Sequence, residues 1–425
     1  MDNIIILRKR MKKTFSIIFI VHIVLIIACS ESITKTPQVP TFNLVQELKN
    51  KTDVPISKYI DSLEYVPLEL TSESAIVEIR KIYLTDGYII IDHSANFPSN
   101  RLMLFDRHTG KFIRFLGKRG EGPEEYRAPV KNFFNPYDNF IYTYGTDHSS
   151  IKRYNLNGEF IESFTTPPNR GSTERVLPVD AFLSSNTFLG YLDNKSGQDS
   201  QRIVIFTRDR IIKSFPHYEK WVNNSIDQYV ELAQNPVITS WDNDISFKER
   251  SNDTVFLVTL DKLIPRFILS TGVFKYPYRF SLKEAYNGFE NQLDYFSINN
   301  MFENSRYVFF DLFNGEERDA SDPNMFHQIH NFLILDKLTL KLTVCNNYEN
   351  YSSYLIDDIN GFLPMIPFSI TEHDELLSVV YPQAVIRWRQ KNPVLKDQLL
   401  IKYPWINQIS EVDNPILLIG KLKTH

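Results

Sequence analysis

The chain has 425 residues, of which 43% are hydrophobic, and its 47 basic and 51 acidic side chains give a formal net charge of -4 at pH 7. The apolar side chains, with 31 Phe and 22 Tyr among the aromatic ones, are numerous enough to bury a large core. A chain without a basic excess lacks the electrostatic footprint of a nucleic-acid-binding protein, so we expect no nucleic-acid partner.

The first element in chain order is a predicted secretion signal that ends just before Cys29. A basic cluster at residues 8–13 precedes an apolar run over residues 15–27, and Ala28-Cys29 follows. This order is typical of a signal peptide, and the run is short for a membrane span of roughly 20 residues. Ile26-Ile27-Ala28-Cys29 resembles the lipobox of bacterial lipoproteins. The resemblance implies that residues 1–28 are removed and that Cys29 carries the lipid.

Two alternatives remain open at this end of the chain: the apolar run could stay as an uncleaved anchor helix, and translation could start at Met11. Under either alternative we expect the globular part to lie outside the cytoplasm and to be tethered to a membrane. With the lipid anchor we expect a protein of the cell envelope, on the outer membrane, facing the periplasm or the cell surface. Residues 29–52 contain prolines and many polar side chains, which is typical of a flexible tether. Residues 53–425 are then the globular domain, in which Cys345 is expected to be a small buried hydrophobe.

A degenerate repeat of about fifty residues follows the tether. Its units are pairs of apolar strands joined by a short polar turn, a pattern that predicts β-hairpins. The phenylalanines that close four successive units are spaced 49, 51 and 52 residues apart, at Phe115, Phe164, Phe215 and Phe267. Each unit has room for about four strands, which favours the blade of a β-propeller. A two-sheet sandwich is the alternative, but its strands would not recur in matched groups of four.

Several segments carry a resemblance to a known family. Residues 115–126 resemble a repeat of NHL type. The whole mature chain is similar to the six-bladed, TolB-like β-propeller lipoproteins of Bacteroidetes in four further segments: Tyr65–Glu69, Phe247–Val255, Asp357–Gly361 and Asp413–Lys423. The resemblance covers roughly residues 55–423. It implies six blades of four strands and no shared catalytic motif.

The ends of the repeat region predict how the ring closes. Because an open sheet edge invites pairing with other chains, we expect an N-terminal strand at residues 62–68 to pair with a C-terminal strand at residues 415–422. Helical periodicity is confined to residues 394–409. The predicted fold is therefore all-β, a six-bladed propeller with a short C-terminal helix before the closing strand.

Signals of catalysis are absent from the sequence: it has no GxSxG, HExxH or Walker A pattern, and we predict no catalytic residue and no cofactor. The candidate metal ligands are His327 and His330, which would share a face on a helix but point to opposite sides on a strand. Glu316, Glu317, Asp319 and Asp322 offer oxygens that suit calcium, although a solvated loop explains them without an ion.

The expected function rests on fold and localisation. We expect a lipid-anchored binding or scaffold module of the cell envelope that is not an enzyme, with a peptide, a glycan or an envelope protein as partner. The alternative is a hydrolase or lyase that acts on a glycan or peptide at the propeller centre. Aromatic groups at the mouth would favour binding: on a strand, the alternate rings of residues 274–280 would share one face. Because packed blades need large side chains to fill the space between them, we expect most of these aromatics to be core.

Overall fold

The computed structural model describes most of the chain, in the ranges 38–94, 101–126, 131–144, 150–168, 177–194, 199–218, 236–277, 295–318, 326–348 and 352–423. The chain divides into two units, Met1–Pro40 and Thr41–His425. The predicted signal peptide and Cys29 lie outside the described residues. All elements below belong to the second unit.

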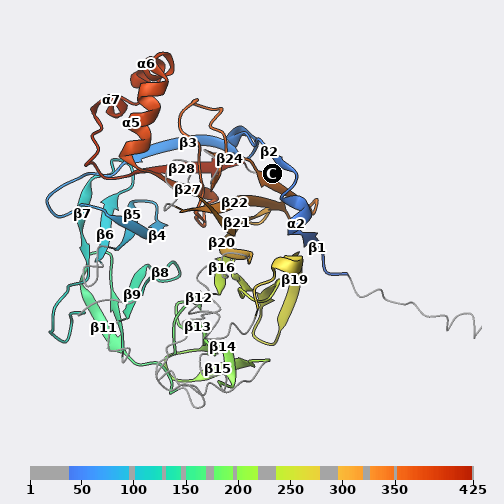
Figure 1. Ribbon diagram of the computed structural model, residues 1–425. Coiled ribbons are helices and arrows are strands. Elements are labelled where there is room, and N and C mark those ends of the chain that lie inside the picture. The colour runs from blue at the N-terminus through green and yellow to red at the C-terminus, as the bar shows by residue number, and fades with distance from the viewer. Residues whose placement is uncertain are drawn as a thin grey trace, which may run out of the picture. The chain divides into compact units, whose positions relative to one another are not determined.

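Six antiparallel sheets form the six blades of a β-propeller (Figure 1). Blade 1 contains β4 (Glu78–Leu84), β5 (Tyr88–Ser94), β6 (Arg101–Asp106) and β7 (Phe112–Leu116). Blade 2 contains β8 (Asn132–Asn135), β9 (Phe140–Tyr144), β10 (Ile151–Tyr154) and β11 (Phe160–Phe164). Blade 3 contains β12 (Ala181–Ser184), β13 (Thr187–Tyr191), β14 (Gln201–Phe206) and β15 (Ile211–Pro216). Within each of these three blades the strands run in chain order from one edge to the other.

Blade 4 contains β16 (Val237–Trp241), β17 (Asp244–Lys248), β18 (Thr254–Val258) and β19 (Leu263–Ser270). Blade 5 contains β20 (Ser297–Glu303), β21 (Tyr307–Arg318), β22 (Phe326–Asp336) and β23 (Lys341–Cys345). Blade 6 contains β26 (Ser369–Ile370), β27 (Glu375–Val380), β28 (Ile416–Leu422) and, from the start of the domain, β3 (Ile60–Pro67). Blade 5 also carries the short pair β24 (Asn347–Tyr348) and β25 (Ser352–Ser353). The predicted propeller of six four-stranded blades is confirmed.

The repeat seen in the sequence is the spacing of the fourth strands. The four closing phenylalanines lie one each in β7, β11, β15 and β19, which are the last strands of blades 1 to 4. The described residues contain six hydrophobic clusters, and each lies at the junction of two neighbouring blades. The core is therefore divided among the blade junctions, and it needs large side chains such as these phenylalanines to fill the gap between sheets.

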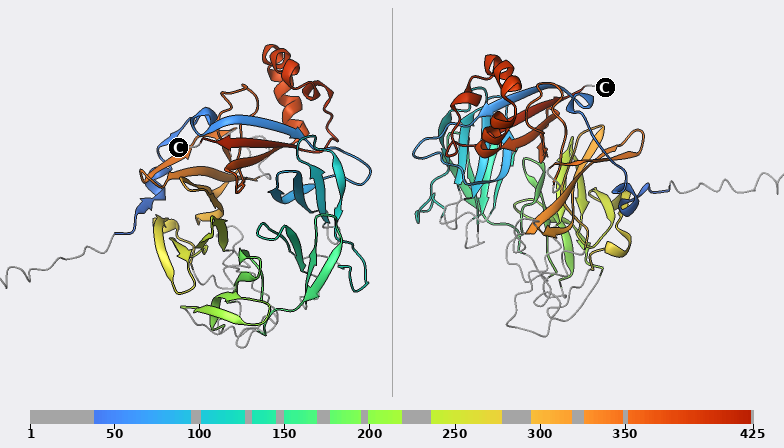
Figure 2. Two further views of the ribbon diagram at one scale, coloured as in Figure 1. Left: turned by 180° about the vertical axis from the view of Figure 1, so that it is seen from behind. Right: turned by 45° about the horizontal axis from the view of Figure 1, so that its top comes forward.

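Ring closure follows the sequence prediction. Strand β28 pairs antiparallel with β3, and Leu418 lies opposite Tyr65 in this ladder. Figures 1 and 2 show the two strands side by side, although they come from opposite ends of the domain. Ile416, Leu417 and Leu418 are fully buried. Burying each side chain contributes about 1.5–3 kcal/mol, so the closing strand is an important part of the stability of the ring.

The predicted tether ends earlier than expected. Residues 41–52, assigned to the tether from sequence, form β1 (Thr41–Asn43), α2 (Leu44–Glu47) and β2 (Lys51–Thr52). Strand β1 pairs in parallel with β19, and β2 pairs in parallel with β23. The tether assignment is therefore wrong for this segment. The segment is polar in composition, but its apolar residues Phe42 and Leu44 are buried at the junction of blades 4 and 5.

A helical insert separates β27 from β28. It contains α5 (Pro382–Lys391), α6 (Pro393–Lys402) and α7 (Trp405–Gln408), whereas two single 3-10 turns, η1 (Ile56–Lys58) and η2 (Gly272–Phe274), lie elsewhere. The sequence predicts one helix here. The structure has three because a proline stands at or just before the start of each, where its missing N–H is tolerated.

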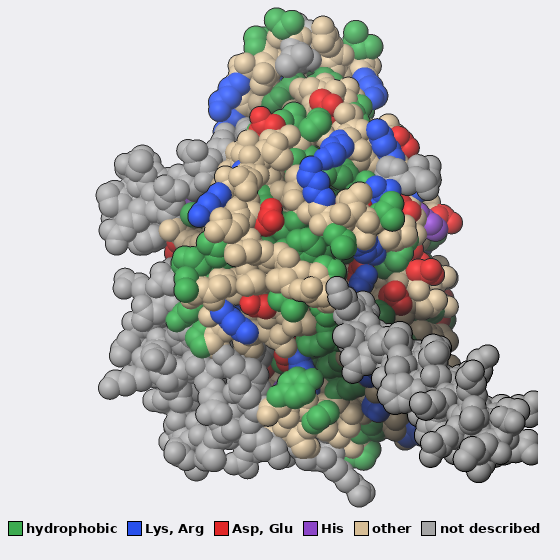
Figure 3. All heavy atoms as spheres, turned by 90° about the vertical axis from the view of Figure 1, so that its right-hand side faces the viewer, with side chains coloured by type: hydrophobic (Ala, Val, Ile, Leu, Met, Phe, Trp, Pro, Cys, Tyr) green, Lys and Arg blue, Asp and Glu red, His purple; other side chains and the backbone are tan. Residues whose placement is uncertain are grey.

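The insert projects from blade 6 (Figure 1) and packs back on the ring through Trp388 and Ile406. Val394 and Ile401 of α6 are exposed, and Figure 3 shows hydrophobic side chains gathered over the outer end of the insert. Within the described ranges, no helix combines the length and apolar character needed to cross a membrane.

Candidate functional site

A cavity of about 760 Å³ opens at the junction of blades 2 and 3. Blade 2 contributes Asp138 from the β8–β9 turn and Arg153 from β10. Blade 3 contributes Ser185 and Asn186 from the β12–β13 turn and residues 207–210 from the β14–β15 turn. The volume falls in the range of about 300–1,000 Å³ that is usual for small-molecule sites. All eight lining side chains are polar or charged, so the cavity suits a hydrophilic ligand.

Two arginines and one glutamate form an ion-pair network beside the cavity. Arg208 donates from both terminal nitrogens to the carboxylate of Glu162, at 2.7 and 2.8 Å. Arg153 donates to the same carboxylate at 2.7 Å. The hydrogen bond from Arg208 is the main cause that lowers the pKa of Glu162. Because Glu162 lies on β11 of blade 2 and Arg208 belongs to blade 3, the network also joins the two blades.

Aromatic rings fix the orientation of both guanidinium groups. Arg153 lies over the ring of Phe140, with 4.1 Å from its guanidinium carbon to the ring centroid. Arg208 lies over Phe164 at 4.3 Å. A planar cation held by a bidentate carboxylate on one side and a ring on another has little freedom. This wall of the cavity is therefore ordered before any ligand arrives.

The turns that form the rim are held by their own hydrogen bonds. Asp138 accepts from the backbone N–H of Phe140 at 3.0 Å and from the hydroxyl of Tyr142 at 2.6 Å. Burial and this contact with Asp138 raise the pKa of Tyr142 to about 12. In the β14–β15 turn, the backbone N–H of Thr207 donates to the carbonyl of Arg210 at 2.9 Å. The rim positions are consequently as well defined as the strands that carry them.

The side chains that remain accessible at the rim are Asn186, Asp209 and Arg210, all of which are exposed. They offer an amide, a carboxylate and a guanidinium group, so both donors and acceptors face the opening. Over the described ranges, no group of three His, Cys, Asp or Glu side chains could hold a metal ion. The arrangement suits recognition by hydrogen bonds.

The predicted metal candidates do not come together. His327 and His330 lie three residues apart on β22, a strand, so their side chains point to opposite faces of the sheet. Nδ1 of His330 lies 2.9 Å from a carboxylate oxygen of Asp311. This hydrogen bond is the main cause that raises the pKa of His330. His330 therefore pairs with Asp311, a residue of its own blade.

The acidic stretch near them is only partly described. Glu316 lies in β21 and accepts a hydrogen bond of 3.4 Å from Gln328. Glu317 belongs to the same strand, in register with His327. Asp319 and Asp322 lie outside the described residues. The two described glutamates are thus part of a β-ladder.

The aromatic group at residues 274–280 is described only in part. Its rings would share one face only on a strand, and the chain forms none at the start of the group, because Phe274 ends the 3-10 turn η2. Its ring stacks on Phe296 with a centroid distance of 4.7 Å, and Tyr276 is buried. Residues 278–280 lie outside the described ranges. Tyr276 therefore packs within the protein, whereas Phe274 is 37% exposed and lies against Phe296.

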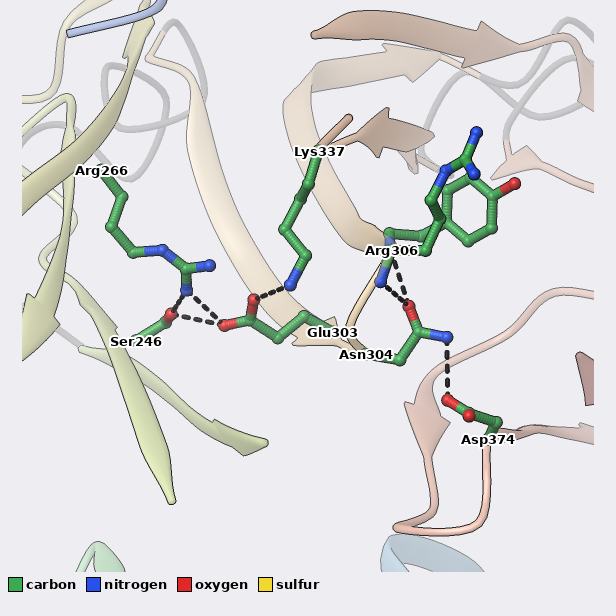
Figure 4. A network of polar contacts seen from close by, with 8 residues as sticks. Ser246, Arg266, Glu303, Asn304, Arg306, Lys337 and Asp374 are labelled. Carbon is green, nitrogen blue, oxygen red and sulfur yellow. Dashed lines mark hydrogen bonds and ion pairs between the residues drawn. The ribbon is translucent and has the colours of Figure 1, made fainter. Parts of the chain in front are cut away.

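A second polar network joins blades 4, 5 and 6 (Figure 4). The carboxylate of Glu303 at the end of β20 accepts from Ser246, from Arg266 at 2.7 Å and from Lys337 at 2.9 Å. Burial acts to raise the pKa of Glu303, but the two cations outweigh it, and the pKa is lowered. Glu303 is almost fully buried and its charge is compensated, so loss of either cation would leave a buried carboxylate with less compensation.

The inner turns of blades 2 and 4 also meet. The hydroxyl of Tyr137 in the β8–β9 turn donates to the side-chain oxygen of Asn243 in the β16–β17 turn at 3.1 Å. Because blade 3 lies between these blades in the ring, the contact reaches across the propeller centre. Turn side chains therefore occupy part of the centre on the same face as the cavity.

The model of a family described as domain of unknown function DUF4934 matches residues 39–421. The chain belongs to this family. No curated protein matches it in sequence. The family assignment extends across the six blades and leaves the cavity without an assigned ligand.

Solved structures share the fold. One is a protein of Bacteroides fragilis whose name describes it as exported, with 17% identity, a TM-score of 0.57, and coverage of 88% of this chain and 98% of that chain. Another is a member of the DUF4221 family from Bacteroides vulgatus, with 10% identity, a TM-score of 0.54, and coverage of 86% and 97%. At these identities, the likeness concerns the propeller fold alone.

The sequence reasoning missed the cavity. Its residues come from four separated segments, and none forms a recognised motif. One signal was available: Arg153 and Glu162 face each other across a predicted hairpin, and the next hairpin turn contains Arg208. That the third residue joins the other two follows only from the packing of blade 3 against blade 2.

Proposed function

We propose that this protein is an exported, lipid-anchored binding module of the cell envelope, and that it holds a small hydrophilic ligand in the cavity between blades 2 and 3. The observation that carries the proposal is the cavity itself, with its all-polar lining and its ordered arginine wall. A preordered site loses little conformational entropy on binding, which favours affinity. Export is supported by the signal-like N-terminus and by the name of the B. fragilis protein.

The chemical groups at the site favour binding over turnover. Glu162, Arg153 and Arg208 neutralise one another in large part, and Asp138 is occupied by hydrogen bonds within its own turn. General acid or base catalysis needs a titratable side chain that is directed at the ligand and free to transfer a proton. The accessible rim groups are Asn186, Asp209 and Arg210, and they suit recognition of a ligand by hydrogen bonds.

A blocking substitution tests the site. Asp209→Trp puts a bulky ring at the rim of the cavity, whereas Asp261→Trp puts it on the β18–β19 turn of blade 4 as a matched control. Both aspartates are exposed, and their turns are equivalent: Thr259 N–H donates to the carbonyl of Lys262 at 3.1 Å. The full chain is screened by thermal shift against peptides, oligosaccharides and small polar solutes.

A ligand of this cavity should raise the melting temperature of the wild type and of Asp261→Trp, but not that of Asp209→Trp. Equal shifts in all three proteins would place the ligand elsewhere and reject the site. Chromatography of each bound compound after incubation then separates the two functions. Product formation would support the hydrolase or lyase alternative, and recovery of the intact compound supports a binding module.

A further inference from the structure

We infer that the ligand of the cavity between blades 2 and 3 is an uncharged, polyhydroxylated molecule, that is, a neutral glycan. This inference rests on the proposed function and names the ligand class of the same site. Three observations carry it: the balance of charge around the cavity, the absence of apolar side chains among its described lining residues, and the mixture of donors and acceptors at its rim.

The formal charges around the cavity cancel. Arg153, Arg208 and Arg210 supply three positive charges, and Asp138, Asp209 and the supporting Glu162 supply three negative ones. Phosphate and carboxylate sites in proteins show an excess of cationic groups and of backbone N–H donors. Here two of the three arginines are already paired with Glu162, so a strongly anionic ligand would find only partial compensation.

The lining also disfavours an apolar ligand or a peptide bound by apolar anchors. Peptide grooves take their affinity from pockets for apolar side chains or from an open sheet edge. The described lining offers hydroxyls from Ser185 and Thr207, an amide from Asn186 and charged groups, and it includes no aliphatic or aromatic residue. Each hydroxyl of a sugar both donates and accepts, which matches carboxylate, amide and guanidinium groups held at fixed positions.

The equivalent turn of blade 4 lacks this chemistry. At the positions of Thr207, Arg208, Asp209 and Arg210, blade 4 has Thr259, Leu260, Asp261 and Lys262. Leu260 is 52% exposed, where Arg208 instead reaches Glu162 of the preceding blade. The same backbone hydrogen bond closes the turn in both blades, so blade 4 has the turn of blade 3 without the arginine that orders the cavity wall.

The test is a glycan-binding measurement with matched variants. The full chain is applied to an array of neutral, uronic-acid-containing and sulfated oligosaccharides, and each hit is measured by calorimetry, with inorganic phosphate as a separate anionic probe. We expect a neutral oligosaccharide to bind with a Kd that changes little between low and high salt, because screening affects charged ligands most. Asp209→Ala and Asn186→Ala should each weaken binding about tenfold, the usual effect of losing one strong hydrogen bond.

The control Asp261→Ala should bind as the wild type does, and unchanged melting temperatures of all variants show that the fold is intact. Binding only of acidic glycans or phosphate, with a Kd that rises with salt, would overturn the ligand class and leave the proposed binding function standing. Absence of any carbohydrate binding, with a different ligand that Asp209→Trp blocks, would overturn the class in the same way. If Asp209→Trp blocks no ligand at all, the proposed function itself fails.

Discussion

The hydroxyl of Tyr65 donates a hydrogen bond of 2.6 Å to Oδ2 of Asp357, although the two residues are 292 positions apart. Tyr65 lies on the closing strand β3, and Asp357 begins the turn before blade 6, where it also accepts the backbone N–H groups of Asn360 and Phe362. Burial, followed by the contact with Asp357, raises the pKa of Tyr65. The tyrosine therefore stays a neutral donor at any ordinary pH.

A third segment, which leads into β28, contacts the residues that follow β3. Asn414, just before β28, accepts from the backbone N–H of Ile76 at 2.8 Å and donates to the carbonyls of Glu69 and Ser74 at 2.8 and 2.7 Å. Three of the segments that carry the family resemblance thus meet where the ring closes. The resemblance describes the closure of the propeller, whereas the cavity between blades 2 and 3 lies apart from it.

Removing the Tyr65 hydroxyl should destabilise the protein. Tyr65→Phe keeps the ring, which packs edge-on against Phe362, but leaves a carboxylate oxygen of buried Asp357 without this donor. We expect a loss of about 1.5–3 kcal/mol in the free energy of unfolding, measured by denaturant titration. Tyr88→Phe, at a more exposed tyrosine, is the control and should change stability by less than about 0.5 kcal/mol. Equal stability of the two variants would contradict the role of this bond.

The closing strand should tolerate truncation of a core side chain poorly. Leu418 of β28 is fully buried between blades 5 and 6, so Leu418→Ala should lower the free energy of unfolding by about 2–5 kcal/mol. Leu338→Ala removes an equal number of atoms from a leucine that is 74% exposed and should have little effect. Similar melting temperatures for the two variants would show that this strand does not contribute to the core of the ring.

A buried ion pair between blades 3 and 4 should be sensitive to loss of either partner. Arg202 donates from Nε to Glu249 at 2.7 Å, and Tyr191 donates to the same oxygen at 3.0 Å. Because both charged groups are almost fully buried, Glu249→Ala should cost about 3–5 kcal/mol by leaving the guanidinium uncompensated. Lys118→Ala breaks an exposed pair and should cost about 0–1 kcal/mol. Chemical denaturation of both variants makes the comparison, and an equal cost would refute it.

The pair of His330 and Asp311 should make stability depend on pH. Since Asp311 raises the pKa of His330 above its usual value of 6.5, the pair stabilises the folded protein fully below that value. This contribution is lost as the pH rises through the folded-state pKa. The melting temperature of His330→Gln should therefore lie below that of the wild type at pH 5 and approach it at pH 8.

His217 serves as an internal contrast in the same titration. Burial, opposed by a hydrogen bond to the carbonyl of Leu192, lowers its pKa. NMR chemical shifts of the two imidazoles, followed as a function of pH, should give a higher pKa for His330 than for His217. The reverse order would contradict the assignment of Asp311 as the partner that charges His330.

The lipid anchor remains a prediction from the sequence. Cys29→Ala should prevent acylation, release the protein from the membrane fraction or trap its precursor, because membrane attachment depends on the acyl chains. Fractionation and metabolic labelling with a fatty acid measure this directly. Cys345→Ala is the matched control, since that thiol is buried and burial raises its pKa to about 12. An unlabelled wild type of unchanged size would rule the anchor out.

The blades could be predicted because they depend on local patterns. Short runs rich in apolar residues, such as Phe112–Leu116 and Phe160–Phe164, with a polar turn before each, predict a hairpin whatever surrounds it. The regular spacing of the closing phenylalanines then reports how many strands each unit holds. The closing pair β3 and β28 was predictable for a different reason: a ring of sheets leaves two edges, and only the terminal strands are available to cover them.

Tertiary structure alone decided the places where distant segments meet. Phe42 reads as one apolar residue in a polar tether, and its burial depends on a groove that blades 4 and 5 create. The H-x-x-H spacing carries opposite meanings on a helix and on a strand, so only β22 settles the direction of its side chains. The cavity has the same origin: Glu162 and Arg208 belong to different blades, and a side chain's partner across a blade junction is set by packing geometry that no local pattern encodes.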